Sequence, residues 1–190
     1  LQNSEGIWNR LALADLDADG DLDLVTGNLG LNTRFTASAD APLLCYANDF
    51  DHNETLDPVV AYHEGGKIYP TVQKQVLVKQ MPFLKKEFIH SKDYANATVS
   101  EILPKKEFSE ALTLRASMLE TCWWENQGGK FVRHILPNQA QVSPVFGILA
   151  HDFNGDGKTD LLLAGNKYGM EAETSRCDAG NGAFFSGDGK

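Results

Sequence analysis

Three nine-residue segments of the chain carry oxygen-bearing side chains at the same four positions. The segments are 15–23, 49–57 and 152–160, and the shared positions are 1, 3, 5 and 9. In a tight loop the side chains at these alternate positions converge, and the main-chain carbonyl at position 7 adds one more oxygen. Because Ca²⁺ takes about six to eight oxygen ligands, the spacing predicts calcium loops that hold about two or three ions in total.

The predicted ligands are the side chains at the four shared positions and the carbonyl group at position 7. They are Asp15, Asp17, Asp19, Asp21 and Asp23 in the first segment; Asp49, Asp51, Asn53, Thr55 and Asp57 in the second; and Asp152, Asn154, Asp156, Lys158 and Asp160 in the third. The residues at position 7 contribute only their carbonyls. The alternative is a solvated acidic turn without metal, but carboxylates that converge without a cation repel one another.

The segments differ from the EF-hand loop, which ends with a bidentate Glu at position 12 and lies between two helices. Position 12 is here Thr26, Val60 or Leu163. Short apolar runs flank the segments, and such runs are typical of strands. We therefore expect each loop to join two antiparallel strands. Position 2 is expected to anchor each loop in a core, and its residues are Leu16, Phe50 and Phe153.

The second segment departs from the template at its turn. Glu54 stands where the other two segments have Gly20 and Gly157. A non-glycine residue with positive φ costs on the order of 1 kcal/mol. We therefore expect calcium occupancy to be lowest in this segment.

Composition restricts the possible partners. The chain has 190 residues, of which 42% are hydrophobic and 23% charged, as in ordinary globular domains. Its net charge of −9 disfavours nucleic acid and anionic membranes as partners. Three bound Ca²⁺ ions would add six positive charges and change −9 to −3. No run of about 18 apolar residues exists, so we expect no membrane span.

The cysteines show no metal or redox spacing. Cys45, Cys122 and Cys177 are widely separated, and we expect them to be small buried hydrophobic residues. A single disulfide remains an alternative that the sequence does not decide.

Repetition extends beyond the acidic segments. Residues 122–136 read as a hairpin, with two β-rich runs around an Asn-Gln-Gly-Gly turn. Residues 183–190 resemble the first half of such a hairpin and stop at its turn. The sequence therefore indicates a part of a longer repeat array, in which each unit packs against its neighbours.

Between residues 73 and 119 the pattern changes from β to helical. Apolar residues occur at helical spacing in 76–89, with Pro82 at a helix start, and from Ser91 through Leu103. A shorter helix is expected from Phe108 to Leu114. The basic residues of this insertion form either a cationic patch or a solvated helix face, and they are Lys74, Lys79, Lys85, Lys86, Lys92, Lys105 and Lys106.

The D-x-[DN]-x-[DN]-G-x-x-D loops between strands resemble the FG-GAP or VCBS repeats of integrin-α-like β-propellers. Longer phrases resemble the Bacteroidetes VCBS-repeat proteins that carry ASPIC/UnbV regions; these phrases lie at 27–32, 79–86, 139–148 and 164–171. The resemblance implies a mainly β fold that forms a partial propeller. Each blade would have four antiparallel strands, with a calcium loop in one of its hairpins. The expected division is propeller blades at 1–72, a helical insertion at 73–119, and propeller blades at 120–190.

The resemblance also implies secretion or display on the cell surface, on the periplasmic or outer-membrane side, where millimolar Ca²⁺ fills loops of modest affinity. We expect a non-enzymatic module for protein or glycan binding or adhesion, with calcium acting on structure and with further blades of a longer chain as partners. An aromatic platform for glycans would come from Trp8, Trp123 or Trp124, although core packing is the alternative use.

The alternative function is an enzyme that acts on polysaccharides, a lyase or hydrolase on the same scaffold. Two carboxylates, Glu171 and Glu173, are two residues apart and lie near Tyr168, Arg176 and Asp178. An acid and base pair of this kind could cleave a glycosidic bond, but the alternative is a salt-bridged strand and turn.

Overall fold

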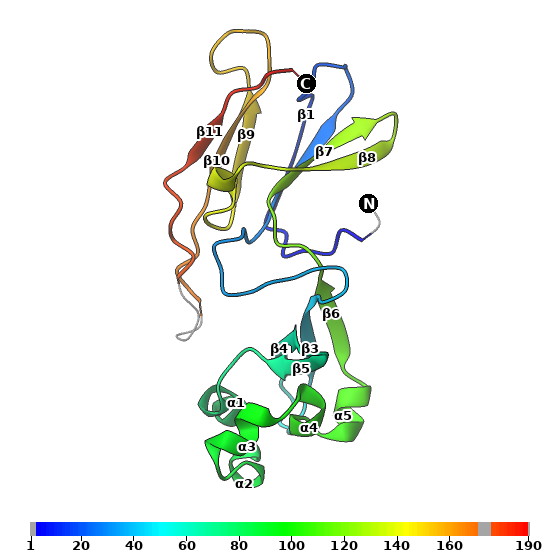
Figure 1. Ribbon diagram of the computed structural model, residues 1–190, viewed down its shortest axis with the longest axis vertical. Helices are drawn as coiled ribbons and strands as arrows, with labels where there is room; N and C mark the ends of the chain where they lie inside the picture. Colours follow the sequence, from blue (N-terminus) through cyan, green and yellow to red (C-terminus); the bar gives the residue numbers. More distant parts are fainter. Residues whose placement is uncertain (1–2, 171–175, 190) are drawn as a thin grey trace. The chain divides into compact units, whose positions relative to one another are not determined.

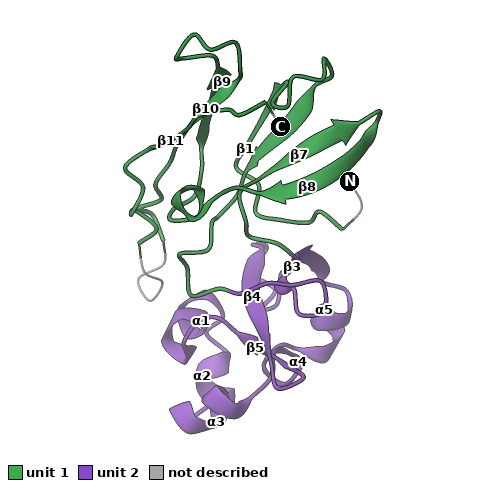
Figure 2. Ribbon diagram, turned by 45° about the horizontal axis from the view of Figure 1, so that its top comes forward, with its two compact units in different colours: residues 1–35, 118–190 green, residues 36–117 purple. Residues whose placement is uncertain are grey.

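The middle of the chain forms a unit of its own, inserted into the unit that both ends build. The structure, a computed structural model, describes residues 3–170 and 176–189. Unit 1 comprises residues 1–35 and 118–190, and unit 2 comprises residues 36–117 (Figure 2). The expected helical insertion covered 73–119, so unit 2 also takes in strands that the sequence pattern assigned to the first block of blades.

Unit 1 contains a four-stranded antiparallel sheet in the order β1-β2-β7-β8. Its strands are β1 (Arg10–Ala14), β2 (Asp23–Gly27), β7 (Cys122–Gln127) and β8 (Lys130–Ile135). Val25 of β2 lies opposite Trp123 of β7, and Trp123 lies opposite His134 of β8. Unit 2 is thus inserted between the second and third strands of this sheet.

The second sheet of unit 1 has the order β11-β10-β9 and is also antiparallel (Figure 1). It consists of β9 (Gly147–His151), β10 (Asp160–Ala164) and β11 (Ala183–Phe185), and a short 3₁₀ turn, Asn138–Ala140, precedes it. One face of each sheet contributes to a shared core that includes Val25, Leu136, Ile148, Leu161 and Leu163. Alternation along the strands produces this arrangement, because every second side chain points to the same face.

Unit 2 is built on a four-stranded antiparallel sheet in the order β5-β4-β3-β6. The strands are β3 (Leu43–Asn48), β4 (Asp57–Glu64), β5 (Lys67–Pro70) and β6 (Leu112–Ala116). The helices are α1 (Lys74–Gln80), α2 (Leu84–Glu87), α3 (Ser91–Asn96), α4 (Val99–Ile102) and α5 (Lys105–Ser109). They pack Leu77, Leu84 and Ile102 against Tyr46 and Val59 of the sheet, so one sheet face lies under the helices.

Two helical expectations change in the structure. The expected segment from Ser91 to Leu103 is divided into α3 and α4, because Thr98 and Glu101 form a capping box that starts a new helix. The expected helix from Phe108 to Leu114 is wrong. Phe108 lies in α5, but Leu114 lies in β6 opposite Cys45 of β3, so sheet pairing overrides the local pattern.

Two other expectations, a hairpin at 122–136 and a mainly β protein, are confirmed. The hairpin at 122–136 forms as β7 and β8, and its turn places Gly128 and Gly129 at φ values of 62° and 93°. The protein is mainly β with antiparallel sheets, but the described residues contain no closed propeller. Among these residues, none of the helices has the length and apolar composition needed to cross a bilayer.

All three cysteines are free thiols in the structure, and Cys122 and Cys177 are buried. Burial raises the pKa of Cys122 to about 11. The three cysteines therefore form no disulfide with one another, and the buried thiols pack as small apolar groups.

Candidate metal loops

Each acidic segment connects two paired antiparallel strands. Loop 1 (residues 15–23) joins β1 to β2, loop 2 (49–57) joins β3 to β4, and loop 3 (152–160) joins β9 to β10. Position 9 of each loop is the first residue of the following strand. The expected arrangement of a loop between antiparallel strands is confirmed in all three cases.

The three loops share one set of internal hydrogen bonds. The main-chain N–H at position 6 donates to the carboxylate at position 1, at N···O distances of 3.1, 2.9 and 2.8 Å in loops 1, 2 and 3. The N–H at position 7 donates to the side-chain oxygen at position 5, at 2.9, 2.8 and 2.9 Å. These bonds fold the side chains at positions 1 and 5 inward, as the ligand spacing predicted.

The aspartate at position 9 is buried in every loop. Asp23, Asp57 and Asp160 are 1%, 2% and 0% exposed. Each accepts a hydrogen bond from the N–H at position 2 of its own loop, at 2.9, 3.1 and 3.0 Å. A buried carboxylate needs such partners, because desolvation disfavours its charged form.

In unit 1 the second oxygen of this aspartate binds the next strand of the sheet. Oδ1 of Asp23 accepts the N–H of Asn126 in β7, and Oδ1 of Asp160 accepts the N–H of Gly187 just after β11, both at 2.8 Å. Loops 1 and 3 therefore have equivalent surroundings. The sequence did not reveal these contacts, because a main-chain donor carries no residue signature.

Left-handed backbone occurs at two positions of each loop. At position 6, Gly20, Glu54 and Gly157 have φ values of 94°, 66° and 85°. At position 4, φ is 63° for Ala18, 60° for His52 and 79° for Gly155. The sequence predicted the turn at position 6 but not the left-handed residue at position 4, where only loop 3 has glycine. Loop 2 adopts the same backbone although neither residue is glycine.

Carboxylates converge within loops 1 and 2. Side-chain oxygens of Asp15, Asp17 and Asp19 lie within 4.8 Å of one another, and so do those of Asp49, Asp51 and Asp57. Oδ1 of Asp15 and Oδ1 of Asp51 are buried, and no donor among the described residues reaches them. A buried oxygen without a partner is unfavourable unless a cation supplies the missing contact.

Loop 3 differs at position 3. Nδ2 of Asn154 lies 3.2 Å from Oδ2 of Asp156, so the amide reaches the side chain at position 5. Main-chain N–H groups of Gly157, Gly155 and Asp156 bind Asp152. These bonds, that from Gly157 above all, lower the pKa of Asp152.

Electrostatics in loops 1 and 2 oppose ionisation. Burial raises the pKa of Asp17, and the nearby charges of Asp19 and Asp23 raise it further, against a hydrogen bond from the Asp19 N–H. Burial also raises the pKa of Asp57, to which the charges of Asp51 and Asp49 add. Burial and the charge of Asp19 raise the pKa of Asp21. A cation among these groups would remove the repulsion.

The donor set fits a hard divalent cation. Every predicted side-chain ligand is a carboxylate or amide oxygen, and the carbonyls at position 7 add neutral oxygens. Sulfur ligands, which zinc also prefers, are absent from the three loops, and the imidazole of His52 in loop 2 is outside the predicted ligand set, with its Nε2 lying 3.2 Å from Glu107. The residues present therefore fit Ca²⁺ better than a transition metal.

The apolar residue at position 2 anchors only two of the loops. Phe50 is buried at 2% exposure, and Leu16 packs against the core of unit 1. The expectation is wrong for Phe153, which is 46% exposed. Its ring packs edge-on against Phe184 and His151.

The residues suggested for an enzyme are only partly described. Tyr168 is exposed, while Glu171 and Glu173 lie outside the described residues. Two histidines pair with glutamates: Nε2 of His52 lies 3.2 Å from Glu107, and Nε2 of His134 lies 2.8 Å from Glu125. The predicted basic residues are mostly exposed, and Nζ of Lys74 donates to the carbonyl of Ile89.

The segment that contains loop 3 matches a known protein family. Residues 148–185 match the FG-GAP repeat. The matched segment runs from β9 through loop 3 and β10 to β11. No curated protein and no solved structure matches the chain significantly.

For this segment the FG-GAP match suggests a propeller-type, integrin-like repeat. It supports the FG-GAP part of the resemblance, whereas the VCBS and ASPIC/UnbV subfamily stays a prediction. In unit 1 the segment β1–loop 1–β2–β7 has the same position 9 contacts as the matched segment, so the two segments share this local geometry.

Proposed function

We propose that this chain is a calcium-binding module of an extracellular β-propeller that binds a protein or a glycan. The observation that carries the proposal is the pair of buried oxygens, Oδ1 of Asp15 and Oδ1 of Asp51, each within a group of converging carboxylates. The residues that would hold the ions are those at positions 1, 3, 5, 7 and 9 of the three loops. Calcium would neutralise their charge and fix the hairpins.

The proposed ions stabilise the structure of the loops and take no part in catalysis. Support comes from the position of the ligands: they lie in hairpin loops whose position 9 carboxylates also bind neighbouring strands. Rigid loops at one end of a sheet are suitable for holding a binding surface. Secretion or cell-surface display agrees with the calcium supply that such loops need.

An exposed apolar row supports membership in a longer array of blades. Leu149, Leu162 and Phe184 lie opposite one another on the three strands of the second sheet, and each is exposed. Repeat units cover such faces by packing against a neighbour. The proposed partners therefore include further blades as well as the protein or glycan ligand, and not nucleic acid, because the acidic surface repels it.

Calorimetric titration of chelator-treated protein with Ca²⁺ tests the proposal. We expect two to three sites per chain and an increase in the free energy of unfolding of about 2.7 kcal/mol per site at a calcium concentration 100-fold above Kd. Asp51→Ala should lower the number of sites by one, because it removes a ligand oxygen and its charge from loop 2. The control is Asp40→Ala, which removes an exposed carboxylate outside the loops.

The absence of calcium binding in the intact chain would overturn the proposal. An unchanged number of sites in Asp51→Ala would remove Asp51 from the ligands. A titration with Mg²⁺ at equal ionic strength is the reference, because it measures how far non-specific screening of the loop charges alone stabilises the protein.

A further inference from the structure

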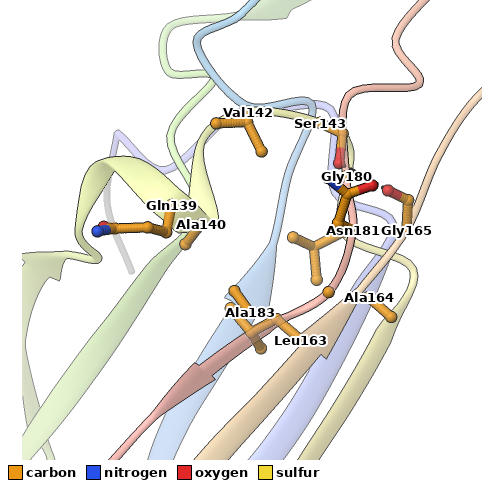
Figure 3. Close-up of a pocket in the computed structure, with 12 residues that line it drawn as sticks. Gln139, Ala140, Val142, Ser143, Leu163, Ala164, Gly165, Gly180, Asn181 and Ala183 are labelled. Carbon is orange, nitrogen blue, oxygen red and sulfur yellow. Dashed lines mark hydrogen bonds between the residues drawn. The ribbon is translucent and has the colours of Figure 1, made fainter.

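Two cavities in unit 1 differ sharply in what they can hold. The smaller, shown in Figure 3, has a volume of about 20 Å³ and is lined by Ser143, Gly165 and Gly180 among others. Oγ of Ser143 donates to the carbonyl of Gly165 at 2.6 Å. This volume admits a single water molecule, so the small cavity belongs to the packing of the sheet.

The larger cavity has a volume of about 300 Å³ and lies at the loop end of unit 1. Leu16 of loop 1 and Thr159 of loop 3 both contribute to its wall, and residues 185–188 close another side. The volume is at the lower end of the range for small-molecule pockets, about 300–1,000 Å³. It is therefore suited to one ring and not to an extended ligand.

Trp123 gives this pocket an aromatic wall in a fixed position. Its indole stacks on the imidazole of His134, with ring centres 4.4 Å apart and planes 17° apart. Nε2 of His134 is held by Glu125 at 2.8 Å. The stack and the hydrogen bond between His134 and Glu125 restrain the indole, so its orientation is set before a ligand arrives.

The indole N–H of Trp123 distinguishes it from the other two tryptophans. Nε1 of Trp8 donates to the carbonyl of Ser4, and Nε1 of Trp124 donates to Oγ1 of Thr26. Among the described residues, none accepts a hydrogen bond from Nε1 of Trp123. Trp123 is half-buried, and an indole N–H without a protein partner donates to water or to a ligand.

The rest of the lining combines apolar surface with hydroxyl groups. Leu136, Leu161 and Phe185 are apolar, and Thr159 and Ser186 carry hydroxyls that both donate and accept. Apolar walls with a few polar groups are the usual composition of a ligand pocket. A sugar ring matches this combination, because its C–H faces pack on an indole and its hydroxyls exchange hydrogen bonds.

We propose that this pocket binds one pyranose ring of a neutral glycan. The inference rests on the proposed function as an extracellular binding module and names its ligand class. Asp188 also lines the pocket, outside the three loops, and its carboxylate favours neutral sugars over anionic ones.

The test is a two-dimensional NMR titration of the intact, calcium-loaded protein that follows the indole N–H signals of the three tryptophans. The probes are the methyl glycosides of glucose, galactose, mannose and N-acetylglucosamine. At least one should shift the Trp123 signal in a saturable way, while the Trp8 and Trp124 signals stay in place. Trp123→Phe assigns the signal.

Two pocket variants and one matched control examine the contacts. Thr159→Val and Ser186→Ala should each weaken sugar binding by about two- to tenfold, the usual effect of losing one hydrogen bond. Phe184→Ala is the control, because Phe184 precedes Phe185 in β11 and points to the opposite face. The affinity of the Phe184→Ala variant for the sugar should equal that of the unmodified chain.

Calcium titration of the same samples separates this inference from the proposed function. If calcium binds and none of the glycosides shifts the Trp123 signal, the sugar pocket is overturned and the calcium module stands. If calcium does not bind, the proposed function falls. A stronger response to N-acetyltryptophanamide than to any glycoside would assign the pocket to an aromatic peptide side chain and overturn the inference, as would equal binding of methyl glucuronide.

Discussion

At the scale of single residues, the loops depend on left-handed backbone at positions 4 and 6. Glycine adopts positive φ without steric cost, whereas other residues lose roughly 1–2 kcal/mol. Loop 3 has glycine at both positions, loop 1 at position 6 only, and loop 2 at neither. The three loops nevertheless share their hydrogen bonds, so the shared bonds outweigh this cost in loop 2.

Gly157→Ala measures this cost directly. A Cβ at Gly157, where φ is 85°, would meet no atom within 4 Å, so the effect comes from the backbone alone. We expect the free energy of unfolding to fall by about 1 kcal/mol in urea denaturation of the calcium-free protein. Gly169→Ala is the control, because it also has open space but no positive φ. Equal stability of the two variants would contradict the argument.

At the scale of elements, a short helix depends on its cap. The four residues of α4 are too few to form a stable isolated helix. The carboxylate of Glu101 accepts the N–H of Thr98 at 2.8 Å and also its hydroxyl. These hydrogen bonds lower the pKa of Glu101 below its usual value near 4.5.

The cap makes a pH-dependent contribution to stability. Because the folded state lowers the pKa of Glu101, the stabilisation is present above pH 4.5 and disappears as pH falls through the folded-state pKa. Glu101→Gln should therefore unfold at lower urea concentration than the unmodified chain at pH 7, and the difference should shrink at pH 3. Glu87→Gln, an exposed glutamate of α2, is the control. A difference that persists at pH 3 would argue against the cap.

At the scale of the whole molecule, the chain is one unit interrupted by another. The sheet β1-β2-β7-β8 joins strands on both sides of unit 2, and Oγ1 of Thr26 donates to the carbonyl of Cys122, 96 residues later. Unit 2 has its own core between its sheet and its helices. Each unit therefore contains the contacts that it needs to fold.

Removal of residues 36–117, with a short Gly-Ser linker in their place, should leave unit 1 folded. The β2–β7 pairing and the core between the two sheets do not use residues of unit 2. Near-ultraviolet circular dichroism should retain the tryptophan signal, and at most two calcium sites should remain, because loop 2 is removed. Loss of cooperative thermal unfolding, compared with the full chain, would show that unit 1 depends on the insertion.

The local parts of the fold and of the candidate site were predictable from the sequence. The three loops, the flanking strands and the hairpin at 122–136 depend on contacts within about ten residues, where spacing and turn residues decide the geometry. The spacing of the acidic loops also predicted FG-GAP repeats, and the match at residues 148–185 supports that prediction. The local pattern from Phe108 to Leu114 predicted one helix. The structure instead ends α5 at Ser109 and begins β6 at Leu112, because β6 pairs with β3.

The sequence by itself thus determined the position of the three loops between their strands and the convergence of carboxylates in loops 1 and 2, because those side chains lie close along the chain. Only the tertiary structure decided that β7 pairs with β2, that Asn126 and Gly187 complete the buried aspartates, and that Trp123 lines a pocket. The physical reason is that these contacts join residues far apart in sequence. Their formation depends on the burial of whole sheet faces, which no local spacing encodes.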